Sequence, residues 1–131
     1  MKFQPDNPAG GVNAINRQDP GRIWVNGALH EGSVLVPWRG AVLPWAAAAL
    51  QDLTSEHFEQ VLGLKPELVI FGSGLRLRFI SPALNRVLIE RGIGMETMDT
   101  AAACRTYNVL ASEGRSVVAA LLQESASSAG G

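Results

Sequence analysis

The second half of the chain alternates between short apolar runs and amphipathic helical patterns, and this alternation most constrains the fold. Apolar runs that end at glycine predict buried strands, while capping residues followed by apolar side chains at helical spacing predict helices. The predicted order is strand 68–71, helix 82–91, strand 94–98, helix 101–113 and strand 116–122. Strands joined by single helices pair in parallel through right-handed crossovers. We therefore expect an α/β domain.

The first half of the chain predicts antiparallel strands. Residues 22–29 alternate in polarity and residues 33–36 form a β-rich run, with the polar turn His30–Gly32 between them. These two segments are predicted to form a hairpin. Residues 41–43 favour a third strand and residues 55–62 favour a helix. The whole pattern predicts one α/β domain with a central mixed sheet, helices packed on it and a small antiparallel N-terminal strand pair.

The two ends differ in composition from the central region. The first twenty residues hold three of the seven prolines and show no periodicity, and the last nine are mostly Ser, Ala and Gly. Such segments favour loops and linkers over packed structure. We expect a flexible N-terminal arm over residues 1–19, a single α/β domain over 20–122 and a disordered tail over 123–131.

Charge and cysteine content exclude several classes of protein. Eleven Lys and Arg against twelve Asp and Glu leave a net charge of −1, without the positive charge typical of nucleic-acid binders. The single cysteine, Cys104, favours a reducing compartment. The apolar run 41–50 is interrupted by Pro44 and is shorter than the roughly twenty residues of a membrane span. Since no signal-peptide pattern begins the sequence, we expect a cytoplasmic protein that neither spans a membrane nor binds nucleic acid.

A glycine turn follows the predicted strand 68–71. Gly72, Ser73 and Gly74 lie at its carboxyl end, and Arg76 and Arg78 follow. In open α/β sheets, ligands favour this edge of the sheet. The next strand ends at Asp99–Thr100, which a parallel sheet places at the same edge. The functional interpretation is a cradle for an anionic ligand, because glycines let backbone N–H groups approach an anion. The structural alternatives are a tight turn that needs positive φ, with Asp99 acting as a helix cap.

The sequence indicates no catalytic residue and no cofactor or metal site. Ser73, a histidine and Asp99 could compose a triad, but the wider G-x-S-x-G element is absent and neither histidine has an orienting motif. The two histidines lack metal-ligand spacing. Cys104 lies one turn into a helix and is more typical of a small buried thiol. An enzyme is therefore the less favoured interpretation.

The predicted helix 101–113 carries a polar face that includes Arg105 and Asn108, and Tyr107 lies in an adjoining turn. Tyrosine and arginine commonly anchor protein interfaces. Arg105, Tyr107 and Asn108 are therefore candidate protein-contact residues. The alternative is a core tyrosine beside a solvated face.

The motifs Gly72–Gly74, Met98–Thr100, Arg105–Leu110 and Glu113–Arg115, with the apolar strand that follows, resemble one small-domain family. That family includes the mitochondrial complex I assembly factor 3 and the adipogenesis-associated domain protein, together with uncharacterised bacterial and archaeal members. The resemblance covers about residues 20–122. The serine of the glycine turn departs from the family, which more often has threonine there and so also carries a hydroxyl.

The resemblance implies a three-layer α/β fold with a central mixed sheet, and no established enzymatic activity. It favours a bacterial, non-catalytic binding or assembly protein with a protein partner, in a context related to respiratory-complex assembly. The alternative from the residues is a small anionic-ligand-binding protein or enzyme that uses the Gly72–Ser73–Gly74 turn. Neither the sequence nor the resemblance indicates an oligomeric state.

Overall fold

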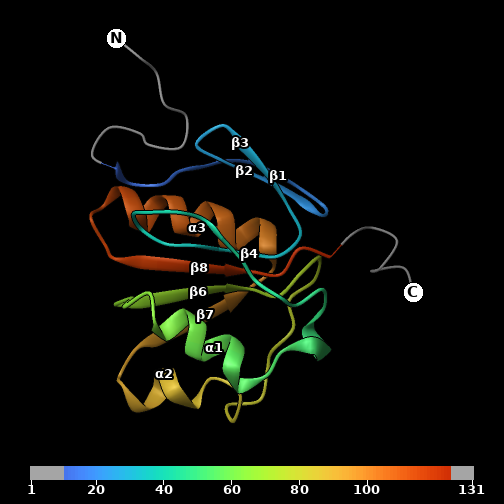
Figure 1. Cartoon of the computed structure of the whole chain (residues 1–131), viewed down its shortest axis with the longest axis vertical. Helices are drawn as coiled ribbons and strands as arrows, with labels where there is room; N and C mark the ends of the chain where they lie inside the picture. Colours follow the sequence, from blue (N-terminus) through green and yellow to red (C-terminus); the bar gives the residue numbers. More distant parts are fainter. Residues whose placement is uncertain (1–10, 125–131) are drawn as a thin grey trace.

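The computed structural model describes residues 11–124, which form a mixed sheet with helices on both faces and a smaller sheet outside one of these helices (Figure 1). The five-stranded sheet has the order β5–β4–β8–β6–β7. Its strands are β4 (Val34–Val36), β5 (Leu43–Pro44), β6 (Leu68–Gly72), β7 (Gly94–Met98) and β8 (Val117–Leu121). β6 runs parallel to both β7 and β8, while β4 runs antiparallel to β8 and β5. The predicted α/β fold with a mixed sheet is confirmed.

Helices cover the two faces of this sheet. The longest, α3 (Thr100–Ser112), packs on one face, and α1 (Ser55–Leu62) and α2 (Arg86–Glu90) lie on the other (Figure 1). A short 3-10 helix, Leu50–Asp52, precedes α1. In β6, Ile70 faces the α3 side, and its neighbours Val69 and Phe71 face the α1 side. Because both faces are covered, every residue of β8 is buried, as the continuous apolar run predicts.

A separate antiparallel sheet covers the outer side of α3 (Figure 1). It consists of β1 (Ile15–Asp19), β2 (Arg22–Val25) and β3 (Ala28–Glu31). The predicted single strand 22–29 is wrong, because Asn26 and Gly27 form a tight turn inside it. Both residues have positive φ, 54° and 85°, which is the conformation of a two-residue hairpin turn that joins twisted strands.

The predicted hairpin between residues 22–29 and 33–36 is also wrong. His30 and Glu31 belong to β3, and the chain then crosses to the other sheet, where β4 pairs with β8. The N-terminal sheet therefore has three strands where the sequence predicts a pair. Its third strand is β1, which falls in the predicted arm, and Ile15 of β1 is buried in the core.

Two further segments differ from the predicted boundaries. Gln123 and Glu124, assigned by composition to the tail, are buried; the remainder of the predicted tail and residues 1–10 of the predicted arm lie outside the described residues. The helix predicted from Pro82 begins at Arg86. The chain before it forms turns, in which the N–H of Leu84 donates to the carbonyl of Ser81 at 3.0 Å.

None of the helices in residues 11–124 has the length and apolarity needed to cross a bilayer.

Candidate functional site

The glycine turn begins with a close approach between β6 and α3. A Cβ atom on Gly72 would lie 2.9 Å from Oγ1 of Thr100 and 3.0 Å from Cδ2 of Leu121. Real Cβ atoms do not approach other heavy atoms so closely without a shift of the neighbours. Gly72 therefore lets the start of α3 pack against the end of β6, which is a structural reason for glycine at this position.

Ser73 is completely buried and closes the turn. Its hydroxyl donates to the carbonyl of Arg76 at 2.7 Å and accepts the N–H of Arg78 at 2.9 Å. Its own N–H donates to the carbonyl of Met98 at the end of β7. Because these bonds use the hydroxyl and solvent does not reach it, Ser73 is placed to hold the turn rather than to attack a substrate.

Thr100 joins the ends of three strands. Its hydroxyl accepts the N–H of Gly74 at 2.9 Å and donates to the carbonyl of Leu122 at 2.6 Å, just after β8. Its N–H donates to the carbonyl of Gly74 at 2.9 Å. The sequence prediction that Thr100 lies beside the glycine turn at one sheet edge matches this geometry. The partners of Thr100, however, are groups of the chain itself.

An anion already lies against this turn, namely the carboxylate of Glu124. Its Oε2 lies 2.7 Å from Nη2 of Arg78, which also donates to the carbonyl of Ser73 at 2.9 Å. Its Oε1 accepts the N–H of Leu75 at 3.4 Å. Gly74 has φ of +109°, and a Cβ there would overlap Glu124. The predicted cradle thus holds an internal carboxylate, and an external anion would have to displace it.

The remaining candidates for the anion site lie at its margin. Asp99 accepts the N–H of Ala102 at 2.9 Å, which makes it the N-cap of α3. Arg76 is exposed and pairs with no carboxylate within residues 11–124. Sequence analysis assigns Glu124 to the tail, because the last nine residues are mostly Ser, Ala and Gly. It places Arg78 beside the turn as an anion-binding residue, but the anion that Arg78 meets is the internal carboxylate of Glu124.

The three candidate protein-contact residues on α3 differ in exposure: Arg105 is exposed, Asn108 is half-buried and Tyr107 is buried. Arg105 is exposed and lines a 260 Å³ groove between α3 and β1. The side chain of Asn108 pairs with the backbone of Ile15, accepting its N–H at 2.8 Å and donating to its carbonyl at 2.7 Å. The hydroxyl of the fully buried Tyr107 donates to the carbonyl of Pro37 at 2.7 Å. Tyr107 is thus a core residue, and its hydroxyl is not available to a partner.

Burial also controls the chemistry of two acidic groups on α3. It raises the pKa of the Cys104 thiol from 9.0 to about 12, because the thiolate would lose its hydration. Burial likewise raises the pKa of Tyr107 above its ordinary value. At neutral pH Cys104 is therefore a protonated thiol, a weak nucleophile. Within residues 11–124 no three side chains of His, Cys, Asp or Glu gather where they could hold a metal ion.

The segment that leaves the glycine turn exposes a row of apolar side chains. Leu75, Leu77 and Phe79 are 40%, 52% and 73% exposed. Two neighbouring residues are anchored to the fold: Arg78 pairs with Glu124, and Ile80, which follows Phe79, packs on the core cluster around α1 and α2. We call Leu75, Leu77 and Phe79 the exposed apolar row. Sequence analysis did not identify it, because the exposure of side chains in an irregular segment depends on tertiary contacts.

Comparisons with known proteins give a consistent family relationship. Residues 15–122 match the model of a family described as a protein of unknown function, DUF498/DUF598. The chain is 37% identical over 124 residues to the NADH dehydrogenase (ubiquinone) 1 alpha subcomplex assembly factor 3 of Bos taurus, covering 85% of this chain and 66% of that protein. It thus spans just under two thirds of the bovine protein's length.

Bacterial proteins are similar over a larger share of their length. An uncharacterised protein of Rhodobacter capsulatus is 36% identical, with 86% of each chain covered. A crystal structure of a protein from Bordetella parapertussis is 37% identical and superposes with a TM-score of 0.83, covering 89% of this chain and 100% of that one. This likeness supports the mixed-sheet α/β architecture described above.

Proposed function

This chain belongs to the DUF498/DUF598 family, and we propose that it is a non-catalytic assembly factor that binds a protein subunit. The name of the bovine relative describes an assembly factor of NADH dehydrogenase. By analogy, the partner proposed for this chain is a subunit of a respiratory NADH dehydrogenase. Because one fold hosts many functions, the proposal depends on a surface of this chain that would bind such a partner.

The exposed apolar row is the observation that carries the proposal. Leu75, Leu77 and Phe79 follow one another at alternate positions on a segment held in place by Arg78 and Ile80. Single exposed apolar residues are common on proteins, whereas several within one short segment favour an interaction site. Burying a leucine or phenylalanine side chain contributes about 1.5–3 kcal/mol, so the row offers a partner several kcal/mol that the isolated chain does not use.

The chemistry of the candidate catalytic groups supports binding over catalysis. Ser73 is buried and hydrogen-bonded within its turn. Cys104 is held as a thiol by its raised pKa. The anion-binding capacity of the glycine turn is occupied by Glu124. By contrast, Arg76, exposed beside the apolar row, is free to contact an acidic group on a partner.

Affinity purification from the source organism tests this proposal. We expect the tagged chain to recover a subunit of NADH dehydrogenase in near-stoichiometric amount. The double substitution Leu77→Ser and Phe79→Ser removes most of the exposed apolar row and should lower recovery at least about tenfold. Val109→Ser is the matched control, because Val109 is 56% exposed but lies on α3.

Two results would contradict the proposal. One is repeated recovery of the chain without any NADH dehydrogenase subunit. The other is undiminished recovery by the double variant, which would place the contact elsewhere. Unfolding curves of both variants complete the experiment, since solvent-exposed positions should change stability by no more than about 0.5 kcal/mol.

A further inference from the structure

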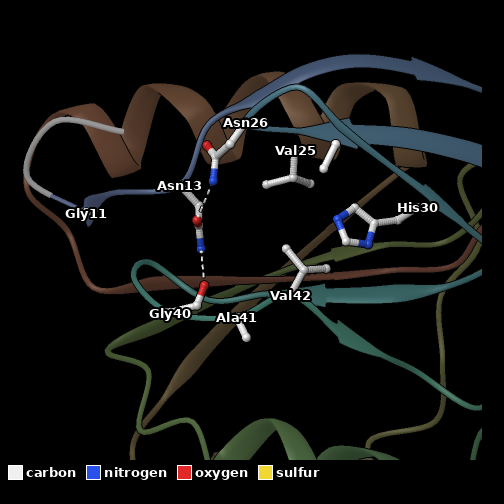
Figure 2. Close-up of a pocket in the computed structure, with 9 residues that line it drawn as sticks. Gly11, Asn13, Val25, Asn26, His30, Gly40, Ala41 and Val42 are labelled. Atoms are coloured by element: carbon white, nitrogen blue, oxygen red, sulfur yellow. Dashed lines mark hydrogen bonds between the residues drawn. The ribbon is translucent and has the colours of Figure 1, made fainter. Parts of the chain in front are cut away.

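A cavity of 460 Å³ lies between the N-terminal sheet and the loop that follows β4 (Figure 2). Val25, Ala28, Ala41 and Val42 contribute apolar walls, and Asn26 and His30 contribute polar groups. A volume of this size is typical of sites for small ligands, which combine apolar walls with a few polar groups. Val25 and Val42 belong to the core on the α3 side of the five-stranded sheet, opposite the α1 and α2 layer, and the lining includes no residue of the exposed apolar row.

Hydrogen bonds hold the walls of this cavity in place. Both Nδ2 hydrogens of the buried Asn13 are used, in bonds to the carbonyls of Pro37 and Gly40 at 2.9 Å each. Oδ1 of Asn13 accepts from Nδ2 of Asn26 at 2.8 Å (Figure 2). The hydroxyl of Tyr107 adds a second donor to the carbonyl of Pro37. The cavity is therefore preorganised, which lowers the entropic cost of binding.

The polar capacity that remains in the cavity includes N–H donors of Asn26 and of the His30 ring. Asn26 uses Oδ1 to accept the N–H of Ala14 and one amide hydrogen to reach Asn13, which leaves its second amide hydrogen. His30 pairs with Ile23 through the backbone of its strand, while its imidazole ring makes no hydrogen bond within residues 11–124. Such donors recognise an oxygen acceptor, and a carboxylate forms the stronger, charge-assisted bonds.

His30 lies on the inner face of its sheet. It is cross-strand from the buried Ile23, and Ala28, two residues away on the same face, also lines the cavity. Figure 2 shows its ring directed toward the space between Val25 and Val42. An imidazole on a face that is otherwise apolar, without a partner among the described residues, is a group that a ligand can satisfy.

We infer that this cavity binds a small monocarboxylate with an apolar body, its oxygens facing His30 and Asn26 and its body facing Val25 and Val42. This inference does not depend on the proposed assembly function. The amide hydrogen of Asn26 and a ring N–H of His30 donate to the carboxylate. The alkyl part of the ligand replaces water along the valine walls, which favours binding by the hydrophobic effect.

A titration of the full chain followed by amide NMR tests the inference, with sodium hexanoate as the probe. We expect saturable shifts at Val25, Asn26, His30 and Val42, with a dissociation constant of about 1 mM or below for a probe of roughly eight non-hydrogen atoms. Pentylammonium has the same five-carbon alkyl chain and no acceptor, so it should bind at least about tenfold more weakly.

Variants locate the site. His30→Leu replaces the imidazole by an apolar side chain of similar size and removes the N–H donor. Hexanoate affinity should therefore fall about tenfold. Ala41→Leu adds volume from the exposed loop that follows β4, narrows the cavity and should weaken hexanoate binding. Because Ala41 lies outside the N-terminal sheet, this variant tests the site even if His30→Leu perturbs that sheet. Glu31→Gln is the matched control, because Glu31 is the exposed neighbour of His30 on β3 and should leave affinity unchanged.

Three results would overturn the inference. The first is the absence of any shift at about 20 mM hexanoate, a concentration well above the expected dissociation constant. The second is equal affinity for hexanoate and pentylammonium, which would show that the cavity binds alkyl chains without recognising a carboxylate. The third is a set of shifts that spares the cavity or survives Ala41→Leu.

Discussion

The carboxylate of Glu124 occupies the position beside Gly74 where an external anion would otherwise bind. It is 8% exposed at the side chain, against 31% for its partner Arg78. The pair also links the segment after β8 to the segment after β6. A single residue outside the predicted domain thereby fixes the direction in which the exposed apolar row leaves the sheet.

Glu124→Gln should destabilise the chain by about 2 kcal/mol, because it leaves the partly buried guanidinium of Arg78 without its counter-charge. Urea unfolding followed by tryptophan fluorescence measures this change. Glu67→Gln is the control: its pair with Arg115 is 3.5 Å long and about half exposed on both sides, so the cost should stay below about 0.5 kcal/mol. Equal effects of the two substitutions would contradict a structural role for the Glu124 pair.

At the scale of elements, the side chain of Asn108 connects α3 to β1 by hydrogen bonds of the kind that join two strands. Its amide oxygen and nitrogen pair with the N–H and carbonyl of Ile15, as the backbone of an adjacent strand would. β1 is one of the two edge strands of the N-terminal sheet, and unpaired edge groups favour unwanted pairing with other chains. The side chain therefore fastens β1 to the helix and satisfies part of its free edge.

Asn108→Ala should release β1 while leaving the five-stranded sheet intact. Loss of two partly buried hydrogen bonds costs about 1–2 kcal/mol, and this loss lowers the free energy needed to open β1 locally. Amide hydrogen exchange at Ile15 should accelerate at least about tenfold, with β6 and β8 unchanged. Ser112→Ala is the control on the same helix, since its hydroxyl bonds only to the carbonyl of Val109. Uniform acceleration across all strands would contradict this local role.

At the scale of the whole molecule, α3 lies between two sheets and is covered on both sides (Figure 1). Cys104 and Tyr107 are buried in this sandwich, and burial raises the pKa of each group. In the unfolded chain both groups ionise at their ordinary pKa values, whereas in the folded chain they keep their protons. Above those values the unfolded state binds fewer protons, so rising pH destabilises the fold.

The free energy of unfolding should therefore fall between pH 8 and 10, by about 1.4 kcal/mol from Cys104 and a smaller amount from Tyr107. The stabilising effect of the Cys104 proton is complete below its unfolded pKa of 9.0 and is lost as pH rises toward about 12. Urea unfolding at the two pH values measures the fall. Cys104→Ala should remove most of it; a variant that loses as much stability as the parent chain would contradict the assignment.

Part of this architecture follows from near neighbours along the chain. The strands at 68–72 and 94–98 and the helix at 100–112 form almost as predicted, because glycine stops, the Asp99 cap and helical spacing act within a few residues. Thr100 was likewise placed beside the glycine turn, because parallel strands bring their carboxyl ends to one edge. The resemblance to a known family over about residues 20–122 implies the same fold, and the family model matches residues 15–122.

The sequence by itself determined the α/β class and the parallel core of the sheet, since these depend on periodicity and capping within each element. Only the tertiary structure decided the partner of β4, the burial of Tyr107, the carboxylate in the glycine turn and the exposed apolar row. Each of these depends on groups far apart in the chain: Glu124 meets Arg78 across 46 positions, and Tyr107 meets Pro37 across 70. Local propensity carries no information on such pairs, because burial and hydrogen bonding in the assembled core select them.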